Sequence, residues 1–301
     1  MTVLIVGAGR DEHARAVEAA VTERGMPATI FDTHAFPGEL SISLGADPAS
    51  IEIAGERVSP SAVYIRDLGL DPVGIADQMS ADWRRAQAAM RERGELVLSI
   101  VHRWEALGIP IYNPLSAFPR ITKPFQLALL ARAGLPVPDT LWTNDPAAVV
   151  RFAEGRRVAY KPVAGGAFTR ILEPRDLDRL GALKNAPVCF QELLPGTDVR
   201  VFVVDGRVAA ACEIEAGATD FREDERGITS VPPNPELDRI CVRACEVLGL
   251  RFTGMDLKAD ASGKLKILEL NPSPMFLGFD RKSGSNVLGA LATALSRPAA
   301  A

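Results

Sequence analysis

Asp256-Leu257-Lys258-Ala259-Asp260 and Leu265-Lys266-Ile267-Leu268-Glu269-Leu270-Asn271 form the stretch that decides the fold. It predicts a strand from Phe252 to Ala259, a turn over residues 261–264 and a second strand that ends in Glu269 and Asn271. Because side chains alternate along a strand, those two point the same way, and Asp256 on the neighbouring strand can join them. Two carboxylates and an amide oxygen suit magnesium held with the help of substrate phosphates. The same residues also fit a hairpin with ordinary polar ends.

The composition is that of a globular chain with a sizeable core. Its 301 residues are 47% hydrophobic and 24% charged, which allows one large domain or two to three small ones. The formal net charge of −4 argues against general binding to nucleic acid or to a membrane surface. We therefore expect neither nucleic acid nor membrane as a partner.

The cysteine pattern and the N-terminus bear on location. The four cysteines form no CxxC pair, so a disulfide framework is not expected. Cys241 and Cys245 lie four apart on a predicted helix, where they serve either as small core residues or as a shared ligand pair. Arg10-Asp11-Glu12 interrupts the apolar N-terminus too soon for a signal peptide, and no run approaches the ~20 apolar residues of a membrane helix. We expect a cytoplasmic protein.

The N-terminal region predicts a strand, a glycine turn and a helix. A buried strand over residues 2–6 leads through Gly7-Ala8-Gly9 into a helix from about Asp11 to Arg24, as in Rossmann-like layers. The third glycine of the dinucleotide fingerprint is missing, so a tight turn competes with NAD binding. A later strand over residues 62–65 ends in Arg66-Asp67, at the sheet edge where ligands gather.

Two lysines and a small-residue loop distinguish the next region. Lys123 precedes a helix predicted over residues 125–133, and Lys161 ends a strand over residues 157–162. Residues 163–168, which include Gly165-Gly166, can fold over phosphates with their backbone N–H groups. No GK[ST] follows, so this is not a P-loop, and a flexible hairpin turn is the alternative.

The remaining elements are mostly strands. Strands are predicted over residues 188–194, 198–204 and 207–212, and Asp205-Gly206 forms a hairpin turn between the last two. Helices are predicted over residues 174–183, 235–248 and 286–295. Residues 219–227 are predicted to form a charged loop, and residues 274–279 an apolar loop.

The order of these features resembles the ATP-grasp superfamily. It runs from Lys123 through Lys161 with its glycine loop to Gln191-Glu192-Leu193-Leu194 and Asp198-Val199-Arg200, and then to Asp220-Phe221-Arg222, Asp256 and Glu269-Leu270-Asn271-Pro272. The chain looks most like the branch that holds RimK-type amino-acid ligases and ATP-grasp enzymes that modify ribosomal peptides. The resemblance covers about residues 113–285.

The resemblance implies an α/β (α+β) chain with the ATP-grasp fold and an N-terminal Rossmann-like pre-ATP-grasp domain. The expected divisions are a pre-ATP-grasp domain over residues 1–113, a small lid subdomain over 114–192 and a metal-binding subdomain over 193–301. Family members are often dimers or tetramers, which implies a homo-oligomer.

The resemblance also implies roles for single residues. Lys123 and Lys161 would bind ATP phosphates, with Gly165 and Gly166 closing over them. Arg222 would face the transferred phosphoryl group, and Arg66 would anchor an anionic substrate, although a structural ion pair is an equal alternative for Arg66. The adenine hinge would be Gln191, Glu192, Leu193 and Leu194, and Glu192 or Asp198 would accept hydrogen bonds from the ribose. The ligands of magnesium, or of manganese as an alternative, would be Asp256, Glu269 and Asn271.

The implied activity is ATP-dependent carboxylate–amine ligation through an acyl phosphate, on an amino acid, a peptide or a protein tail. Positioning and charge neutralisation would do most of this work. The alternatives are a macrocyclase or cross-linker of a ribosomal peptide, a nucleotide-binding module without turnover, and an NAD-dependent oxidoreductase. After Arg222 the sequence carries Glu223-Asp224 and a single Gly227, where amino-acid ligases tend to carry a small residue, an asparagine and a glycine pair. This departure favours a different or more cationic acceptor.

Overall fold

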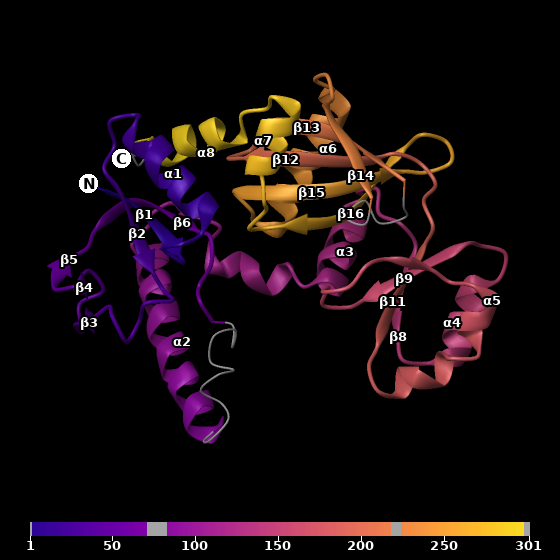
Figure 1. Ribbon diagram of the computed structural model, residues 1–301, viewed down its shortest axis with the longest axis horizontal. Helices are drawn as coiled ribbons and strands as arrows, with labels where there is room; N and C mark the ends of the chain where they lie inside the picture. Colours follow the sequence, from indigo (N-terminus) through magenta and orange to yellow (C-terminus); the bar gives the residue numbers. More distant parts are fainter. Residues whose placement is uncertain (1, 71–82, 218–223, 298–301) are drawn as a thin grey trace. The chain divides into compact units, whose positions relative to one another are not determined.

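The computed structural model describes residues 2–70, 83–217 and 224–297, which form two compact units (Figure 1). The first comprises Met1–Ser116, Met275–Leu277 and Val287–Ala301, and the second comprises Ala117–Pro274 and Gly278–Asn286. The predicted domain limits at residues 113 and 192 stay predictions.

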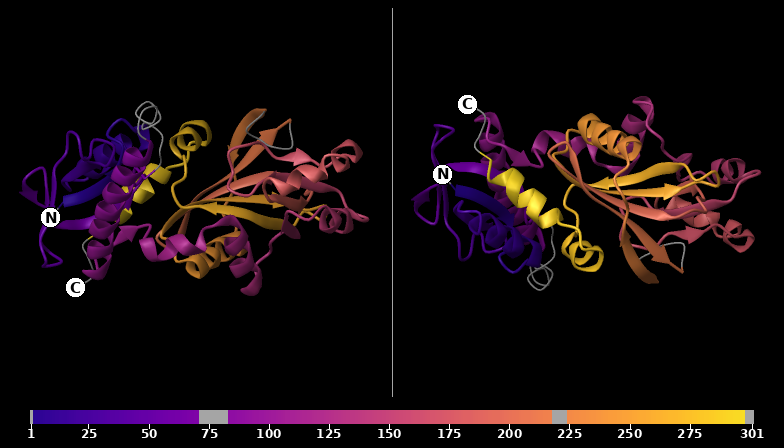
Figure 2. Two further views of the ribbon diagram at one scale, coloured as in Figure 1. Left: turned by 90° about the horizontal axis from the view of Figure 1, so that it is seen from below. Right: turned by 90° about the horizontal axis from the view of Figure 1, so that it is seen from above.

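The first unit is built on a parallel sheet of order β2-β1-β6-β7. β1 and β6 are mostly apolar and almost entirely buried, as expected of parallel strands with both faces covered. Asp11 caps α1 by accepting a hydrogen bond from Ala14 N at 2.8 Å. Near the other end of the chain, α8 packs against α1 (Figure 2). The bounds are β1 Thr2–Gly7, α1 Glu12–Thr22, β2 Ala28–Asp32, β6 Pro60–Ile65, α2 Trp83–Ala106, β7 Ile111–Tyr112 and α8 Val287–Leu295.

A small antiparallel sheet also belongs to the first unit. It consists of β3 Ile42–Leu44, β4 Ile51–Ile53 and β5 Glu56–Arg57. The kinship of this unit to Rossmann-like domains stays a prediction.

The second unit contains a small antiparallel sheet of order β10-β9-β11-β8. α4 packs against it with η2 around Val149, Val158 and Phe190. Asp145 caps α4 by accepting a hydrogen bond from Ala147 N. The bounds are β8 Thr140–Thr143, α4 Pro146–Ala153, β9 Val158–Pro162, β10 Arg170–Ile171, α5 Pro174–Leu177, η2 Leu180–Lys184 and β11 Val188–Glu192.

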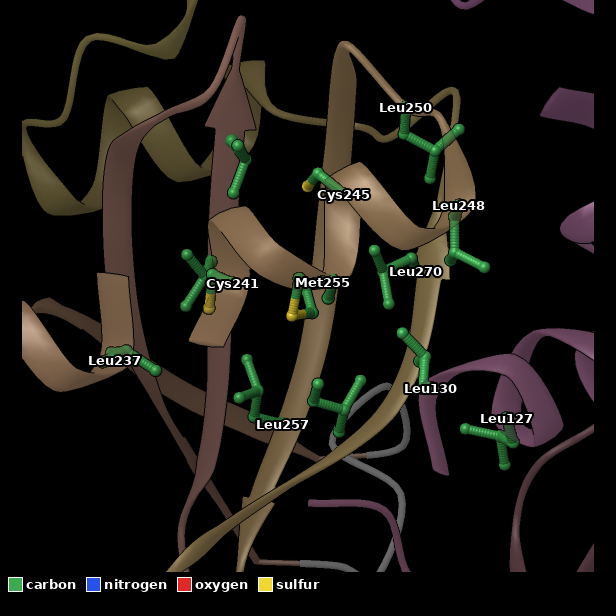
Figure 3. Packing of buried hydrophobic residues seen from close by; sticks show 14 of the residues in the cluster. Leu127, Leu130, Leu237, Cys241, Cys245, Leu248, Leu250, Met255, Leu257 and Leu270 are labelled. Carbon is green, nitrogen blue, oxygen red and sulfur yellow. The ribbon is translucent and has the colours of Figure 1, made fainter. Parts of the chain in front are cut away.

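The larger sheet of the second unit is antiparallel and five-stranded, with the order β14-β13-β12-β15-β16. α3 and α6 cover one of its faces, and Cys241 and Cys245 lie in this core, which confirms them as core residues (Figure 3). The bounds are α3 Lys123–Arg132, β12 Asp198–Val204, β13 Arg207–Ala216, β14 Glu225–Ser230, α6 Pro235–Leu248, β15 Phe252–Ala259 and β16 Leu265–Asn271; η1 Leu115–Arg120 precedes α3.

Alternation along these strands decides what the other face carries. Val199, Val201 and Val203 of β12 pack toward the helices, so Arg200 and Phe202 point to the opposite face. On β15, Met255 and Leu257 join the same core, which leaves Asp256 on the opposite face. The hairpin expected at Asp205-Gly206 is confirmed, with positive φ at both residues.

Three sequence predictions were wrong. The helix expected over residues 174–183 is two short pieces, α5 and η2. The loop expected over residues 274–279 gives way to α7, Leu277–Ser283. The charged loop expected to end at residue 227 ends earlier, because Glu225 already pairs with β13 through Ala216. Within the described residues, no helix is both long and apolar enough to cross a membrane.

Candidate active site

Arg200, Asp256 and Glu269 form a row across three adjacent strands of the large sheet. Arg200 on β12 is the register partner of Asp256 on β15, and Asp256 is the register partner of Glu269 on β16. Arg200 Nη1 donates to Asp256 Oδ1. The row therefore holds one guanidinium and two carboxylates on the face opposite the helical layer.

A bulge in β16 keeps the row together. Asp256 pairs with Glu269 but Leu257 pairs with Ile267, so Leu268 is the extra residue. A bulge of this kind re-aims the side chains that follow it. Asn271 lies two residues beyond Glu269 on the same side, and its Oδ1 accepts a hydrogen bond from Ser273 N at 3.0 Å. The structure thus places the three predicted metal ligands on one face.

Lys123 is the first residue of α3, and its Nζ lies 2.6 Å from Glu269 Oε2. One turn further along α3, Gln126 is 1% exposed and bonds to both backbone groups of Leu270. Its Nε2 donates to Leu270 O at 2.9 Å, and its Oε1 accepts from Leu270 N at 2.8 Å. This pairing locks the helix that carries Lys123 to the strand that carries Glu269.

Lys161 and the glycine loop approach the same place from the small sheet. Lys161 is the register partner of Cys189, and its charge attracts the ionised forms of both Asp256 and Glu269. Gly165 and Gly166 have φ of +99° and +89°, which L side chains rarely adopt. A Cβ on Gly165 would lie 3.6 Å from Lys123 Nζ, so the loop and both lysines converge.

Burial and charge move the two carboxylates in opposite directions. Burial raises the pKa of Asp256 above its ordinary value, despite the opposing effect of Arg200. Burial also acts to raise the pKa of Glu269, but the combined attraction of Lys123, Lys161 and Arg200 leaves it below its ordinary value. Burial raises the pKa of the Cys189 thiol to about 11, so this neighbour of Lys161 stays a neutral thiol at pH 7.

The predicted adenine hinge already uses several of its polar groups within the chain. Gln191 Nε2 donates to Thr140 Oγ1 at 2.9 Å, and Glu192 accepts from Lys266 Nζ and from Asp139 N. The N–H groups of Glu192 and Leu193 donate to the carbonyls of Asp139 and Arg157, and Leu194 is buried. Contact with adenine through this segment stays a prediction.

Asp198, the second predicted ribose acceptor, is also in an ion pair. Its Oδ2 lies 2.5 Å from Lys258 Nζ, and both side chains are largely buried. Lys258 is the register partner of Lys266, the partner of Glu192. Each lysine of this cross-strand pair is thus neutralised by one of the two predicted ribose acceptors.

The two arginines predicted as catalytic are not placed in this cluster. Arg222, with the rest of Asp220-Phe221-Arg222-Glu223, lies outside the described residues. Arg66 belongs to the first unit, where its Nε lies 3.2 Å from Asp11 Oδ2. Their roles stay predictions.

The residues present fit a divalent metal brought in with phosphates. In the described ranges no group of three His, Cys, Asp or Glu side chains could hold a metal. Asp256, Glu269 and Asn271 offer only two carboxylates and an amide oxygen, all of them hard ligands. Magnesium is commonly bound in this way, through one or two carboxylates together with substrate phosphates.

Sequence reasoning did not assign a role to two residues of this cluster. Arg200 was named only as part of Asp198-Val199-Arg200, and the strand register alone placed it on Asp256. Gln126 had no signal apart from being a polar residue on the buried side of an otherwise apolar helix.

Comparisons with known proteins agree with this geometry. The model of the RimK-like ATP-grasp domain matches residues 122–295, so the chain belongs to the RimK-like ATP-grasp family. It is an ATP-grasp ligase, a class of enzymes that use ATP with a divalent metal. The probable alpha-L-glutamate ligase 1 of Shewanella amazonensis is 26% identical, over 99% of this chain and 96% of that protein.

Two solved structures cover nearly the whole chain. The ATP-grasp ligase PsnB, complexed with a phosphomimetic variant of its minimal precursor, Mg and ADP, is 47% identical over 97% of each chain, with a TM-score of 0.93. The macrocyclase MdnC of Microcystis aeruginosa, bound with the precursor peptide MdnA, is 25% identical over 99% of this chain and 100% of that one, with a TM-score of 0.83.

Proposed function

We propose that this ligase uses ATP and magnesium to convert a carboxylate on a peptide into an acyl phosphate, which an amine then attacks to give an amide. The observation that carries the proposal is the row of Arg200, Asp256 and Glu269, with Lys123 and Lys161 beside it. This cluster is largely buried, and it brings together cations that can bind phosphate and oxygen ligands that can bind a metal. The similarity to PsnB and MdnC, both solved with precursor peptides, supports a peptide substrate.

The proposed reaction has two steps. A carboxylate oxygen forms a bond to the γ-phosphorus of ATP as the bond to the β,γ-bridging oxygen breaks, which releases ADP. The acceptor nitrogen then bonds to the acyl carbon, the carbon–oxygen bond to phosphate breaks, and the acceptor loses one proton. Phosphoryl transfer of this type depends mainly on positioning and charge neutralisation.

The residues divide this work by their chemistry. Lys123 and Lys161 bind phosphate oxygens as point charges, and the backbone of Gly165 and Gly166 closes over them. Asp256, Glu269 and Asn271 hold the magnesium ion, which neutralises phosphate charge when bound. Arg200, which combines a planar fork with near-complete burial, donates to the reacting anion.

Arg66 and Arg222 are kept as proposed substrate-facing residues, and the Gln191–Leu194 segment with Asp198 as the proposed adenosine contact. The cytoplasmic location, the homo-oligomer and the absence of nucleic-acid and membrane partners also stay proposals. So do the three domains over residues 1–113, 114–192 and 193–301.

A cross-linker of a single peptide is the second candidate. The likeness to MdnC favours it, because MdnC is a macrocyclase solved with a precursor peptide, and PsnB, 47% identical to this chain, is a ligase solved with a minimal precursor. In that case donor and acceptor lie on one peptide, and the acceptor is an amine or a hydroxyl.

Mass spectrometry of products separates these functions. The chain is incubated with ATP, Mg²⁺, free amino acids and peptides that carry acidic, lysine and threonine side chains. Joining two molecules gives their summed mass less one water, whereas an internal cross-link lowers the mass of one peptide by one water per bond. Mild alkali opens an ester and leaves an amide. ATP binding without ADP release for all of these amino acids and peptides would instead indicate a nucleotide-binding module without turnover. NAD binding would favour the NAD-dependent oxidoreductase.

A further inference from the structure

Arg200 is held in an unusual environment for a charged side chain. The residue is 8% exposed, and its Nη1 donates to Asp256 Oδ1. Among the described residues its buried Nε–H has no hydrogen-bond partner. A buried donor without a partner is costly, so the surrounding packing must hold the guanidinium in this position.

Gly254 provides the space on one side of the guanidinium. It is the neighbour of Asp256 on the same face of β15. A Cβ at this position would lie 3.0 Å from Arg200 Nε, 3.1 Å from Arg200 Cζ and 2.7 Å from Pro274 Cβ. Any side chain at residue 254 would therefore displace the guanidinium of Arg200 or the ring of Pro274.

Two aromatic rings flank the same group. The Cζ of Arg200 is 5.6 Å from the ring centre of Phe202 and 6.0 Å from that of Phe279. The rings pack edge to face, with centroids 5.2 Å apart. Both contacts fall within the range of cation–π attraction, which is strongest where water is excluded.

Phe279 is fixed to the sheet through α7. Ser283, one turn further along, donates its hydroxyl to the Phe279 carbonyl at 2.8 Å, and its Oγ lies 3.4 Å from Cys212 Sγ on β13. Lys282 forms an ion pair with Glu225 on β14. The helix that presents Phe279 is thus attached to two strands of the sheet that carries Arg200.

We propose that Gly254 and Phe279 are positioning residues for Arg200: the glycine leaves room for the guanidinium, and the ring fixes the plane in which its donors face the reacting anion. This inference rests on the proposed function, in which Arg200 contacts that anion. In this role Phe279 and Gly254 act through Arg200, which each of them approaches closely.

A spectroscopic test needs no substrate. The chain is labelled with ¹⁵N-arginine, and the Nε–H signals of Arg200 and Arg156 are assigned from Arg200→Lys and Arg156→Lys. The ring current of Phe279 shifts the Arg200 signal, so we expect Phe279→Met, which keeps the side-chain volume nearly constant, to move it. Phe152→Met is the matched control, because Phe152 lies under Arg156 with Cζ 4.6 Å from the ring centre. It should move only the Arg156 signal. An unmoved Arg200 signal in Phe279→Met overturns the inference.

A kinetic test separates positioning from folding. The donor is N-acetylglutamate, hydroxylamine is the acceptor, and ADP release is measured. We expect Phe279→Met and Gly254→Ala to lower kcat about tenfold, while the KM for ATP stays within about twofold. Phe279→Tyr, which keeps the ring, should restore the rate, and Phe152→Met should not change it. If the enzyme does not turn over N-acetylglutamate and hydroxylamine, the peptide substrate identified by mass spectrometry is used instead. Until then, the spectroscopic test decides whether Phe279 positions Arg200.

A double-mutant cycle with Arg200→Lys distinguishes the two proposals. Lysine keeps the charge but not the planar fork, so adding Phe279→Met to Arg200→Lys should change kcat by less than about twofold. The same loss in both backgrounds would show a merely structural role and overturn the inference. If the single variant Arg200→Lys is slow but the single variant Phe279→Met works at the wild-type rate, only the positioning role of Phe279 is overturned. Full activity of Arg200→Lys overturns both this inference and the assigned role of Arg200.

Discussion

Lys123 Nζ lies 2.6 Å from Glu269 Oε2, so a residue proposed to bind phosphate neutralises a residue proposed to bind metal. Asp256 is neutralised in the same way by Arg200. A divalent cation that binds without nucleotide must compete with both side chains. Phosphate groups offer Lys123 another partner, so nucleotide and metal should bind cooperatively.

We therefore predict that Lys123→Met strengthens Mn²⁺ binding in the absence of nucleotide by about tenfold, which corresponds to about 1.4 kcal/mol of competition removed. The same variant should bind ATP more weakly. Electron paramagnetic resonance of free Mn²⁺ measures the first effect. Lys161→Met is the matched control, and this variant should also weaken ATP binding. In the described part of the chain Lys161 has no ion pair with Glu269, so Lys161→Met should change the Mn²⁺ affinity less. Equal effects of the two variants would contradict the prediction.

Replacing Glu269 with Gln keeps the side-chain shape and removes one metal-binding charge. We expect ADP release to fall by about 100-fold or more, as when one group that stabilises transition-state charge is lost. The circular dichroism spectrum should stay that of the wild type. Full activity in this variant would show that Glu269 is not a metal ligand.

The stability of the fold should depend on Glu269 in a pH-dependent way. Its pKa is lower in the folded chain than in the unfolded chain, so its ionised form stabilises the fold above the unfolded pKa, and this contribution is lost as the pH falls through the folded pKa. Urea unfolding should therefore show wild type more stable than Glu269→Gln at pH 7, with a smaller difference near pH 4. A difference that grows toward acid would refute the direction of this shift.

Gln126→Leu should loosen the strand that carries Glu269. The change leaves the buried N–H and C=O of Leu270 without partners, at a cost of about 1–3 kcal/mol for each group. Hydrogen exchange at the Leu270 amide should accelerate more than that of its neighbours. Leu237→Ala, a core truncation on α6 that costs about 2–5 kcal/mol, is the control for general destabilisation. It should accelerate exchange without singling out Leu270.

Arg66→Ala should raise the KM for the peptide more than that for ATP, if Arg66 anchors an anionic substrate. Arg66 forms an ion pair with Asp11, so a control variant must show what loss of this ion pair does by itself. Asp11→Asn removes the charge but keeps an oxygen to cap α1. Equal KM changes in both variants, or none in Arg66→Ala, would show that Arg66 has only a structural role.

The hairpin and the set of ligands could be predicted because they depend on local rules. Alternation and turn residues placed Glu269 and Asn271 on one side, and the Asp205-Gly206 turn fixed a hairpin. The bulge at Leu268 could not be foreseen, because it depends on how β16 pairs with β15. Without it, Lys266 and Glu269, three residues apart, would point to opposite faces.

The start of α7 was missed for a similar reason. The segment over residues 274–279 is short and apolar and contains Pro274 and Gly278, which locally favours a loop. The helix depends on contacts from far along the chain, such as Ser283 with Cys212 and Lys282 with Glu225. Ion pairs such as Asp198 with Lys258 likewise depend on the strand order, which residue types alone do not give.

Gln126 also protects the rim of the sheet. β16 is an edge strand, and the unpaired backbone of such a strand is a template for adding a guest strand. Gln126 occupies both backbone groups of Leu270, and the Ile267 N–H donates to the Pro136 carbonyl at 2.7 Å. A second copy of the chain or an extended peptide cannot dock by strand addition at these two residues. Strand-by-strand aggregation therefore has no starting point at Ile267 or Leu270.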